Sequence, residues 1–135
     1  MIKKAILCVD DEKIILDSIR GQLQGKYGNQ YIYESAQSAD EAWEILLEFE
    51  ADEIDVLLIF SDWLMPGIKG DEFLIKVHKK FPKVIKVLLT GQADRESVMK
   101  AEQSADLFKC ISKPWDQNEL YETVEFSLGS RTQNE

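Results

Sequence analysis

Apolar runs of strand length alternate with segments of helical period along almost the whole chain, and this alternation limits the fold more than any other feature. Five runs have the length and composition of buried strands: 5–9, 31–36, 55–61, 84–89 and 107–111. Five segments repeat apolar residues at helical spacing: 14–23, 39–49, 71–81, 95–105 and about 116–128. Each strand therefore leads into one helix, which is the pattern of repeated strand–helix units.

The strand runs are apolar on both faces, so helices must cover both sides of the sheet that they form. This predicts an α/β fold with a flavodoxin-like, doubly wound, five-stranded parallel sheet in the order 2-1-3-4-5 and five helices. A chain of 135 residues with 44% hydrophobic residues has enough apolar material for one domain. We place this domain at residues 1–128 and interpret the polar residues 129–135 as a C-terminal tail or linker stub.

Polar residues follow four of the five predicted strands. They are Asp10-Asp11, Asp62, Thr90-Gly91 and Ser112-Lys113-Pro114. Ligands of doubly wound sheets bind where the carboxyl ends of the strands meet, beside the point where the strand order reverses. The sequence therefore predicts one functional site at this edge.

The residue types at this edge predict phosphoryl chemistry. Asp10, Asp11 and Asp62 would repel one another without a cation, and oxygen ligands alone favour Mg²⁺. A carboxylate can attack phosphorus when a metal and a lysine neutralise the transferring group, and Lys113 and the Thr90 hydroxyl fit its oxygens. Asp62 follows the central strand and is our candidate nucleophile, with Asp10 and Asp11 holding the metal.

Each of these residues also has an ordinary structural interpretation. Asp10 or Asp11 alone would more often cap the following helix, and Asp62 before a Pro-Gly loop could be a turn residue. Lys113 alone would more often be a solvated surface lysine. Only their joint arrival at one edge of the sheet favours a site.

Four motifs closely resemble the receiver domain of two-component response regulators. They are Val9-Asp10-Asp11-Glu12, Ser61-Asp62-Trp63-Leu64-Met65-Pro66-Gly67, Leu89-Thr90-Gly91 and Lys113-Pro114-Trp115. The resemblance extends over the chain to about Leu128. It implies a phosphorylation switch in which a sensor histidine kinase supplies the phosphoryl group. The output partner or domain would contact the face formed by the fourth helix, fifth strand and fifth helix.

The resemblance also implies a role for each matching residue. Asp62 would be the phosphoacceptor, and Asp11, Asp62 and the backbone carbonyl of Leu64 would bind Mg²⁺ with help from Asp10. Thr90 and Lys113 would bind the phosphoryl group. The Lys113–Pro114 peptide bond would be cis.

Two positions bear on how such a switch would signal. Cys110 stands three residues before Lys113, where many receivers have a switching Tyr or Phe. Leu64 has an apolar side chain that cannot orient a hydrolytic water, so we predict slow self-dephosphorylation. Residues 90–94 and 113–115 look like those of receivers that precede cyclic-dinucleotide phosphodiesterases or cyclases.

Two other functions fit the residues less well. A phosphatase of the haloacid dehalogenase-like class would need an Asp-x-Asp-x-Thr run after the first strand, whereas residues 10–14 read Asp-Asp-Glu-Lys-Ile. Flavin binding would need a phosphate-cradling loop at the same place, which is missing. A signalling domain, not a turnover enzyme, fits best.

The composition excludes several partners. A net charge of −9 repels nucleic acid, and no apolar stretch is long enough to cross a membrane. The free cysteines Cys8 and Cys110 fit the reducing cytoplasm. The single histidine, His78, is expected to be exposed and not catalytic. A phosphorylation-dependent homodimer is left open by the sequence.

Overall fold

The chain folds into a parallel β-sheet between two layers of helices. The structure is a computed structural model. It describes residues 2–91 and 95–133, with side chains as far as residue 129. The strands are β1 (Lys4–Val9), β2 (Ile32–Ala36), β3 (Asp55–Asp62), β4 (Ile85–Thr90) and β5 (Lys109–Ser112). All neighbouring pairs are parallel and the order is β2-β1-β3-β4-β5. The predicted fold class and strand order are confirmed.

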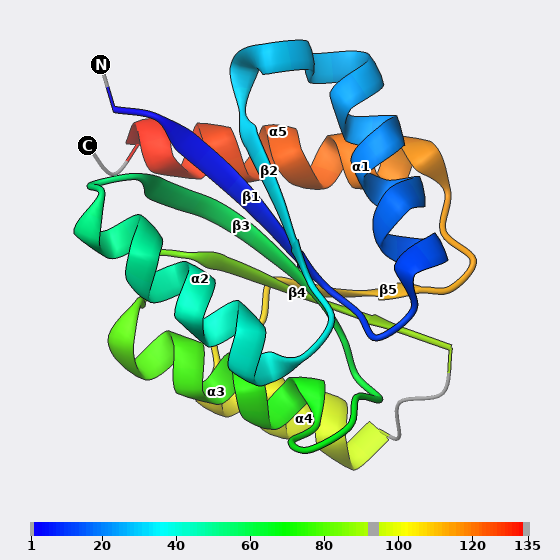
Figure 1. Cartoon of the computed structure of the whole chain (residues 1–135). Helices are drawn as coiled ribbons and strands as arrows, with labels where there is room; N and C mark the ends of the chain where they lie inside the picture. The colour runs from blue at the N-terminus through cyan, green and yellow to red at the C-terminus, as the bar shows by residue number, and fades with distance from the viewer. Residues whose placement is uncertain (1, 92–94, 134–135) are drawn as a thin grey trace.

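The helices divide between the two faces of the sheet (Figure 1). Helices α1 (Lys13–Tyr27) and α5 (Gln117–Gln133) cover one face. Helices α2 (Ala39–Ala51), α3 (Gly70–Lys80) and α4 (Arg95–Ser104) cover the other. A short 3₁₀ turn, η1 (Gly28–Gln30), follows α1 and was not predicted.

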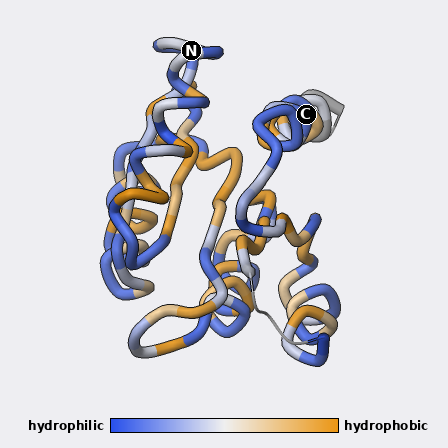
Figure 2. The backbone as a smooth tube through the Cα atoms, turned by 90° about the vertical axis from the view of Figure 1, so that its right-hand side faces the viewer, coloured by the Kyte–Doolittle hydropathy of each residue, from blue (hydrophilic) through white to orange (hydrophobic). Residues whose placement is uncertain are grey.

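The core lies in two layers because the strands are buried on both faces. Along β3, Leu57, Leu58, Ile59 and Phe60 are completely buried. Leu57, Leu58 and Phe60 pack in the layer of α1 and α5, and Ile59 packs in the layer of α2, α3 and α4. The strict alternation of a strand is interrupted at Leu57–Leu58, where the pairing of β3 with β1 shifts register. The helices present apolar stripes to these residues, and hydrophobic and hydrophilic stretches alternate along their turns (Figure 2). The central position of β3 places its last residue, Asp62, in the middle of the sheet edge.

Two sequence expectations need correction. Helix α5 continues to Gln133, past the expected end near Leu128, because Gly129 lowers helix propensity but does not stop a helix as proline would. His78 is half-buried instead of exposed, and its Nδ1 is enclosed without a hydrogen-bond partner among the described residues. It lies one turn after the buried Leu74 on α3. No helix in the described ranges is long and apolar enough to cross a membrane.

Candidate functional site

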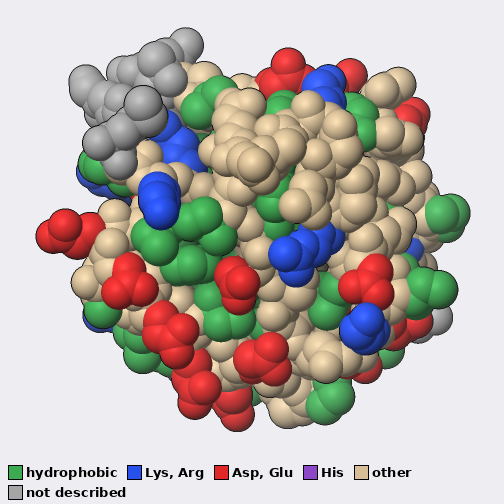
Figure 3. All heavy atoms as spheres, turned by 45° about the horizontal axis from the view of Figure 1, so that its top comes forward, with side chains coloured by type: hydrophobic (Ala, Val, Ile, Leu, Met, Phe, Trp, Pro, Cys, Tyr) green, Lys and Arg blue, Asp and Glu red, His purple; other side chains and the backbone are tan. Residues whose placement is uncertain are grey.

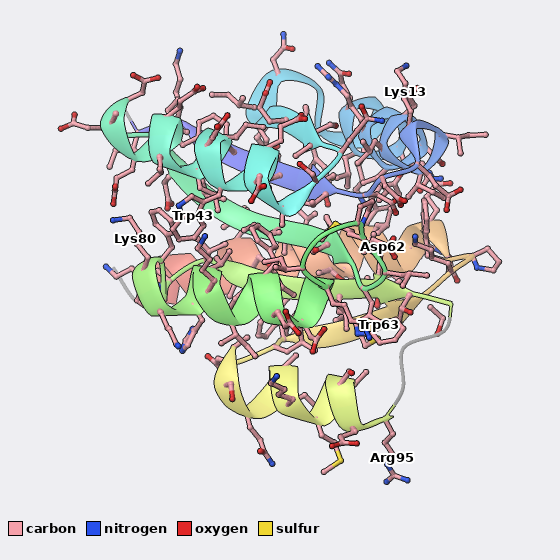
Figure 4. The ribbon with its side chains drawn as sticks, turned by 60° about the horizontal axis from the view of Figure 1, so that its bottom comes forward. Lys13, Trp43, Asp62, Trp63, Lys80 and Arg95 are labelled. Atoms are coloured by element: carbon pink, nitrogen blue, oxygen red, sulfur yellow. The ribbon has the colours of Figure 1, made fainter. Side chains whose placement is uncertain are left out.

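The predicted site residues meet at the carboxyl edge of the sheet, where Figure 4 shows Asp62 at the end of its strand. A hollow of about 270 Å³ opens there. It is lined by Asp11, Glu12, Asp62, Leu64, Thr90, Gly91 and Lys113. Asp10 lies directly behind it and is completely buried. Of the residues singled out at the strand ends, five line this hollow and Asp10 contacts it through Lys113, whereas Ser112 and Pro114 do not line it.

Lys113 connects two of the carboxylates. Its Nζ donates to Asp10 Oδ2 at 2.7 Å and to Asp62 Oδ1 at 3.0 Å. Its backbone N–H donates to the carbonyl of Thr90 at 3.1 Å, which ties the residue after β5 to the end of β4. Lys113 is thus a fixed cation and not the solvated surface lysine that its sequence position alone would suggest.

Asp10 is held from three sides. Its backbone N–H donates to the carbonyl of Ala36 at 3.0 Å, and its Oδ1 accepts the N–H of Glu12 at 2.8 Å. Its other oxygen accepts from Lys113. The N-cap of α1 is Glu12, whose side chain makes no capping hydrogen bond. Neither Asp10 nor Asp11 is therefore the helix cap.

The electrostatics of Asp62 oppose its ionisation. Burial raises the pKa of its carboxyl, and the Asp10 charge raises it further, while hydrogen bonds from Lys113 and the Leu64 backbone lower it in part. Burial also works against the charge of Lys113, but its hydrogen bonds to Asp10 and Asp62 leave its pKa raised. A charged Lys113 therefore faces an Asp62 carboxylate whose negative charge is poorly stabilised. A further cation would lower the repulsion between the carboxylates of Asp62 and Asp10.

The carboxylates are close enough to share a metal ion. One oxygen each from Asp10, Asp11 and Asp62 lies within 4.8 Å of the other two. Asp11 is exposed whereas the other two are buried, so the group opens toward solvent on one side. An all-oxygen set that is partly open to water suits Mg²⁺, which keeps several of its water ligands. The residues present therefore fit that ion.

Gly70 is a site residue that sequence reasoning missed. A Cβ at Gly70 would lie 2.0 Å from the carbonyl oxygen of Asp62 and 2.9 Å from the Cα of Trp63. The Gly70 N–H also donates to the Trp63 carbonyl at 2.8 Å. The first turn of α3 thus contacts the backbone of Asp62 directly. The spacing of apolar residues in the sequence cannot predict such a contact.

The two residues after Asp62 point in different directions. Trp63 is buried on the side of α3 and α4, with Lys69 Nζ 4.9 Å from its ring centroid (Figure 4). Its Nε1 has no hydrogen-bond partner among the described side chains and backbone. Leu64 is exposed and lines the hollow. An apolar side chain thus borders the site, and the slow self-dephosphorylation that we expect from it stays a prediction.

Two further expectations concern β5 and its neighbours. The Lys113–Pro114 bond is cis, as the resemblance implied. Cys110 is half-buried, and burial raises its pKa, with Glu102 and Glu119 adding to the effect. Burial raises the pKa of Cys8 to about 12, so that thiol stays protonated. Residues 92–94, part of the predicted output-type motif, lie outside the described residues.

Residues 6–125 match the model of the protein family named response regulator receiver domain. The chain belongs to the response regulator receiver family. A chemotaxis protein CheY homolog of Campylobacter jejuni is 30% identical over 127 residues, which cover 93% of this chain and 92% of that protein. The hydrogenase transcriptional regulatory protein HoxA of Cupriavidus necator is 32% identical over 119 residues, 88% of this receiver. This receiver spans only 23% of the length of that HoxA.

Solved structures support the same assignment. A CheY-like receiver domain protein of Methanospirillum hungatei has a TM-score of 0.83 at 29% identity and full coverage of both chains. The signal receiver domain of an HD domain-containing protein from Pseudomonas fluorescens has a TM-score of 0.86 at 26% identity. That match covers 99% of this chain and 93% of the other. The chain is thus a CheY-like receiver domain of a response regulator in both sequence and fold.

Proposed function

We propose that Asp62 of this receiver accepts a phosphoryl group from a sensor histidine kinase in a Mg²⁺-dependent reaction. One observation carries the proposal: Lys113 lies 3.0 Å from Asp62 Oδ1 and 2.7 Å from Asp10 Oδ2, at the rim of an open hollow. A buried carboxylate is thereby presented to solvent beside a fixed positive charge. Phosphoryl transfer needs this combination because the transferring group is itself negative.

The metal would be held by the carboxylates of Asp10, Asp11 and Asp62 and by the backbone carbonyl of Leu64. The mutual approach of the three carboxylates and the position of Leu64 in the same hollow support this ligand set. When bound, Mg²⁺ supplies positive charge that offsets the phosphoryl oxygens and the carboxylates. Asp10 would contribute a carboxylate oxygen to the metal, and the hydrogen bond from Lys113 holds that carboxylate in place.

The reaction on the protein is an in-line substitution at phosphorus. A carboxylate oxygen of Asp62 forms the new P–O bond, while the P–N bond to the donor imidazole breaks and its electron pair stays on the imidazole. The product is an acyl phosphate on Asp62. Lys113 Nζ and the Thr90 hydroxyl, which both border the hollow, donate hydrogen bonds to the phosphoryl oxygens.

The same geometry favours a switch over a turnover enzyme. The acyl phosphate stays on the chain, and its charge shifts the population of the face made by α4, β5 and α5 toward a form that binds an output partner. Met99 and Phe126 are exposed on that face, and Phe126 stacks on Phe108 with ring centroids 4.2 Å apart. A partner or a second phosphorylated receiver could cover these apolar groups. Half-buried Cys110 lies on β5 between them and the site.

The domain layout and location follow from the same assignment. We place the receiver at residues 1–128 and interpret 129–135, of which α5 includes residues up to Gln133, as a C-terminal tail or linker stub. The relatives have different outputs: one structural neighbour is the receiver of an HD domain-containing protein, and one sequence relative is a transcriptional regulatory protein. The net charge of −9 disfavours direct contact of this segment with nucleic acid. A cytoplasmic location suits the free thiols.

The test is phosphotransfer from an autophosphorylated histidine kinase, followed on a gel after acid quenching. Wild type should become labelled only with Mg²⁺, and hydroxylamine, which cleaves acyl phosphates, should remove the label. Asp62→Asn should take up none. A label on Asp62→Asn equal to wild type, or one that resists hydroxylamine, would refute the assignment.

A further inference from the structure

Helix α3 and the loop after it carry a cluster of positive charge that the proposed switch does not use. The eight residues from Lys76 to Lys83 include four lysines and no acid, in a chain whose net charge is −9. Helix α2 beside it has five acids and no basic residue. In Figure 3 acidic side chains gather along the lower left of the face shown, where α2 lies. The basic cluster therefore interrupts a predominantly acidic surface.

Aromatic rings lie beside these lysines. Trp43 of α2 meets Phe81, at the end of α3, edge to face with ring centroids 5.7 Å apart. Lys76 Nζ lies 4.2 Å from the Trp43 centroid, and Lys80 Nζ lies 5.6 Å from that of Phe81. Figure 4 shows Trp43 and Lys80 between α2 and α3, at the end of the molecule away from Asp62. The rings are half-buried, so one side of each pair is accessible.

A hollow of about 370 Å³ opens next to these rings, between α2, α3 and the starts of β3 and β4. We call it the α2–α3 hollow. Its apolar walls come mainly from Leu46, Ile54, Val56, Phe81 and Val84. Its polar lining includes Lys80 and Lys83, together with Glu50 and Asp55. A hollow of this size accepts a large apolar side chain.

The positive charge at the rim is only partly neutralised. Lys80 approaches Glu50 at 3.7 Å, but both side chains are about half exposed, and such pairs are weak. Lys83, which also lines the hollow, has no ion-pair partner among the described residues. Lys83 is thus available to an anionic ligand, and Lys80 can exchange its weak pair with Glu50 for one.

We propose that the α2–α3 hollow binds a short acidic segment of a partner protein, with one large apolar side chain inserted and flanking carboxylates on Lys80 and Lys83. The apolar walls and the lysine rim match those two parts of such a segment. A nucleic acid fits less well, because it offers no aliphatic anchor and its long charge run would meet acidic α2. The surface is far from the phosphorylation site, so this contact is additional to the proposed output face.

The probe is a fluorescein-labelled peptide in which Asp and Glu flank one Phe and one Leu, measured by fluorescence anisotropy. Two control peptides replace the acids by Asn and Gln, or the two apolar residues by Ala. The test variant combines Lys80→Glu with Lys83→Glu. The matched control combines Arg20→Glu with Lys100→Glu, which are exposed elsewhere and change the net charge equally. Thermal melts verify that both variants fold.

We expect wild type and the matched control to bind the acidic peptide with the same affinity within about twofold, and the test variant to bind about tenfold more weakly, which corresponds to roughly 1.4 kcal/mol. Both control peptides should also bind at least about fivefold more weakly, and binding should weaken with salt. The indole N–H signal of Trp43 should shift in NMR spectra on addition of the acidic peptide. Equal binding by test variant and matched control would overturn the proposal. So would preferential binding of an RNA oligonucleotide or anionic vesicles at the same lysines.

Discussion

Replacing Gly70 by alanine should destabilise the receiver, because α3 begins in direct contact with the backbone of the phosphoacceptor. The added Cβ would lie 2.0 Å from the Asp62 carbonyl oxygen, and real Cβ contacts are not shorter than 3.0 Å. The first turn of α3 must therefore withdraw by about 1 Å. Since the opposing atoms are main chain, no side-chain rotation can relieve the contact.

The magnitude follows from three contributions. Overpacking costs about 1–3 kcal/mol, and weakening the hydrogen bond from the Gly70 N–H to Trp63 costs about 1 kcal/mol. Alanine has less backbone entropy than glycine in the unfolded chain, which stabilises the folded state by about 0.5–1 kcal/mol and offsets part of this loss. We expect the free energy of unfolding to fall by about 2 kcal/mol. The phosphorylation rate should fall too, because Asp62 moves with its carbonyl.

Urea denaturation followed by circular dichroism measures the effect. Gly21→Ala is the matched control, since Gly21 is an exposed helical residue with nothing within 4 Å of an added Cβ. Alanine there should raise the free energy of unfolding by about 0.5–1 kcal/mol. If Gly70→Ala were as stable as wild type, or gained as much as Gly21→Ala, the contact with Asp62 would not constrain the fold as described.

Three further outcomes concern the site. Asp62→Asn should be more stable than wild type near neutral pH. The pKa of Asp62 is raised in the folded state above its ordinary value of 3.8, so ionising this carboxyl costs the folded protein stability as the pH rises from 3.8 through the folded pKa. Asparagine cannot ionise and avoids this cost. The advantage should therefore shrink in urea melts at lower pH, and an unchanged difference would contradict the sign. Mg²⁺ at about 100 times its Kd should stabilise wild type by about 2.7 kcal/mol, and Asp11→Asn should lose most of this gain in thermal melts. Leu64→Asn should speed acyl-phosphate hydrolysis by roughly fivefold, because one hydrogen bond to the attacking water is worth about 1 kcal/mol. A rate equal to wild type would rule out that role for the position.

The sequence predicted the site well because parallel strands bring their carboxyl ends to one edge. Asp10, Asp62 and Lys113 are far apart in the chain, yet strand periodicity alone placed them together. The direct contact of Lys113 with both aspartates could not be derived in this way. It depends on side-chain reach and on the hydrogen bond to the Thr90 carbonyl.

The sequence predicted less where a residue's surroundings are set by tertiary contact. His78 lies among lysines in the chain and reads as exposed, but the helical turn carries it to the side of α3 that is covered. No pattern in the sequence marks Gly70, but a Cβ there would lie 2.0 Å from the Asp62 carbonyl oxygen, so only glycine fits. The end of α5 was placed too early because glycine is only a weak stop signal without a following proline.

The measurement that tests the central assignment most directly is intact mass after incubation with acetyl phosphate, with and without Mg²⁺, on wild type and Asp62→Asn. We expect one phosphoryl adduct on wild type with Mg²⁺. We expect none on wild type without Mg²⁺, and none on Asp62→Asn with or without it. An adduct that forms on Asp62→Asn as on wild type, or that forms equally in EDTA, would contradict the assignment.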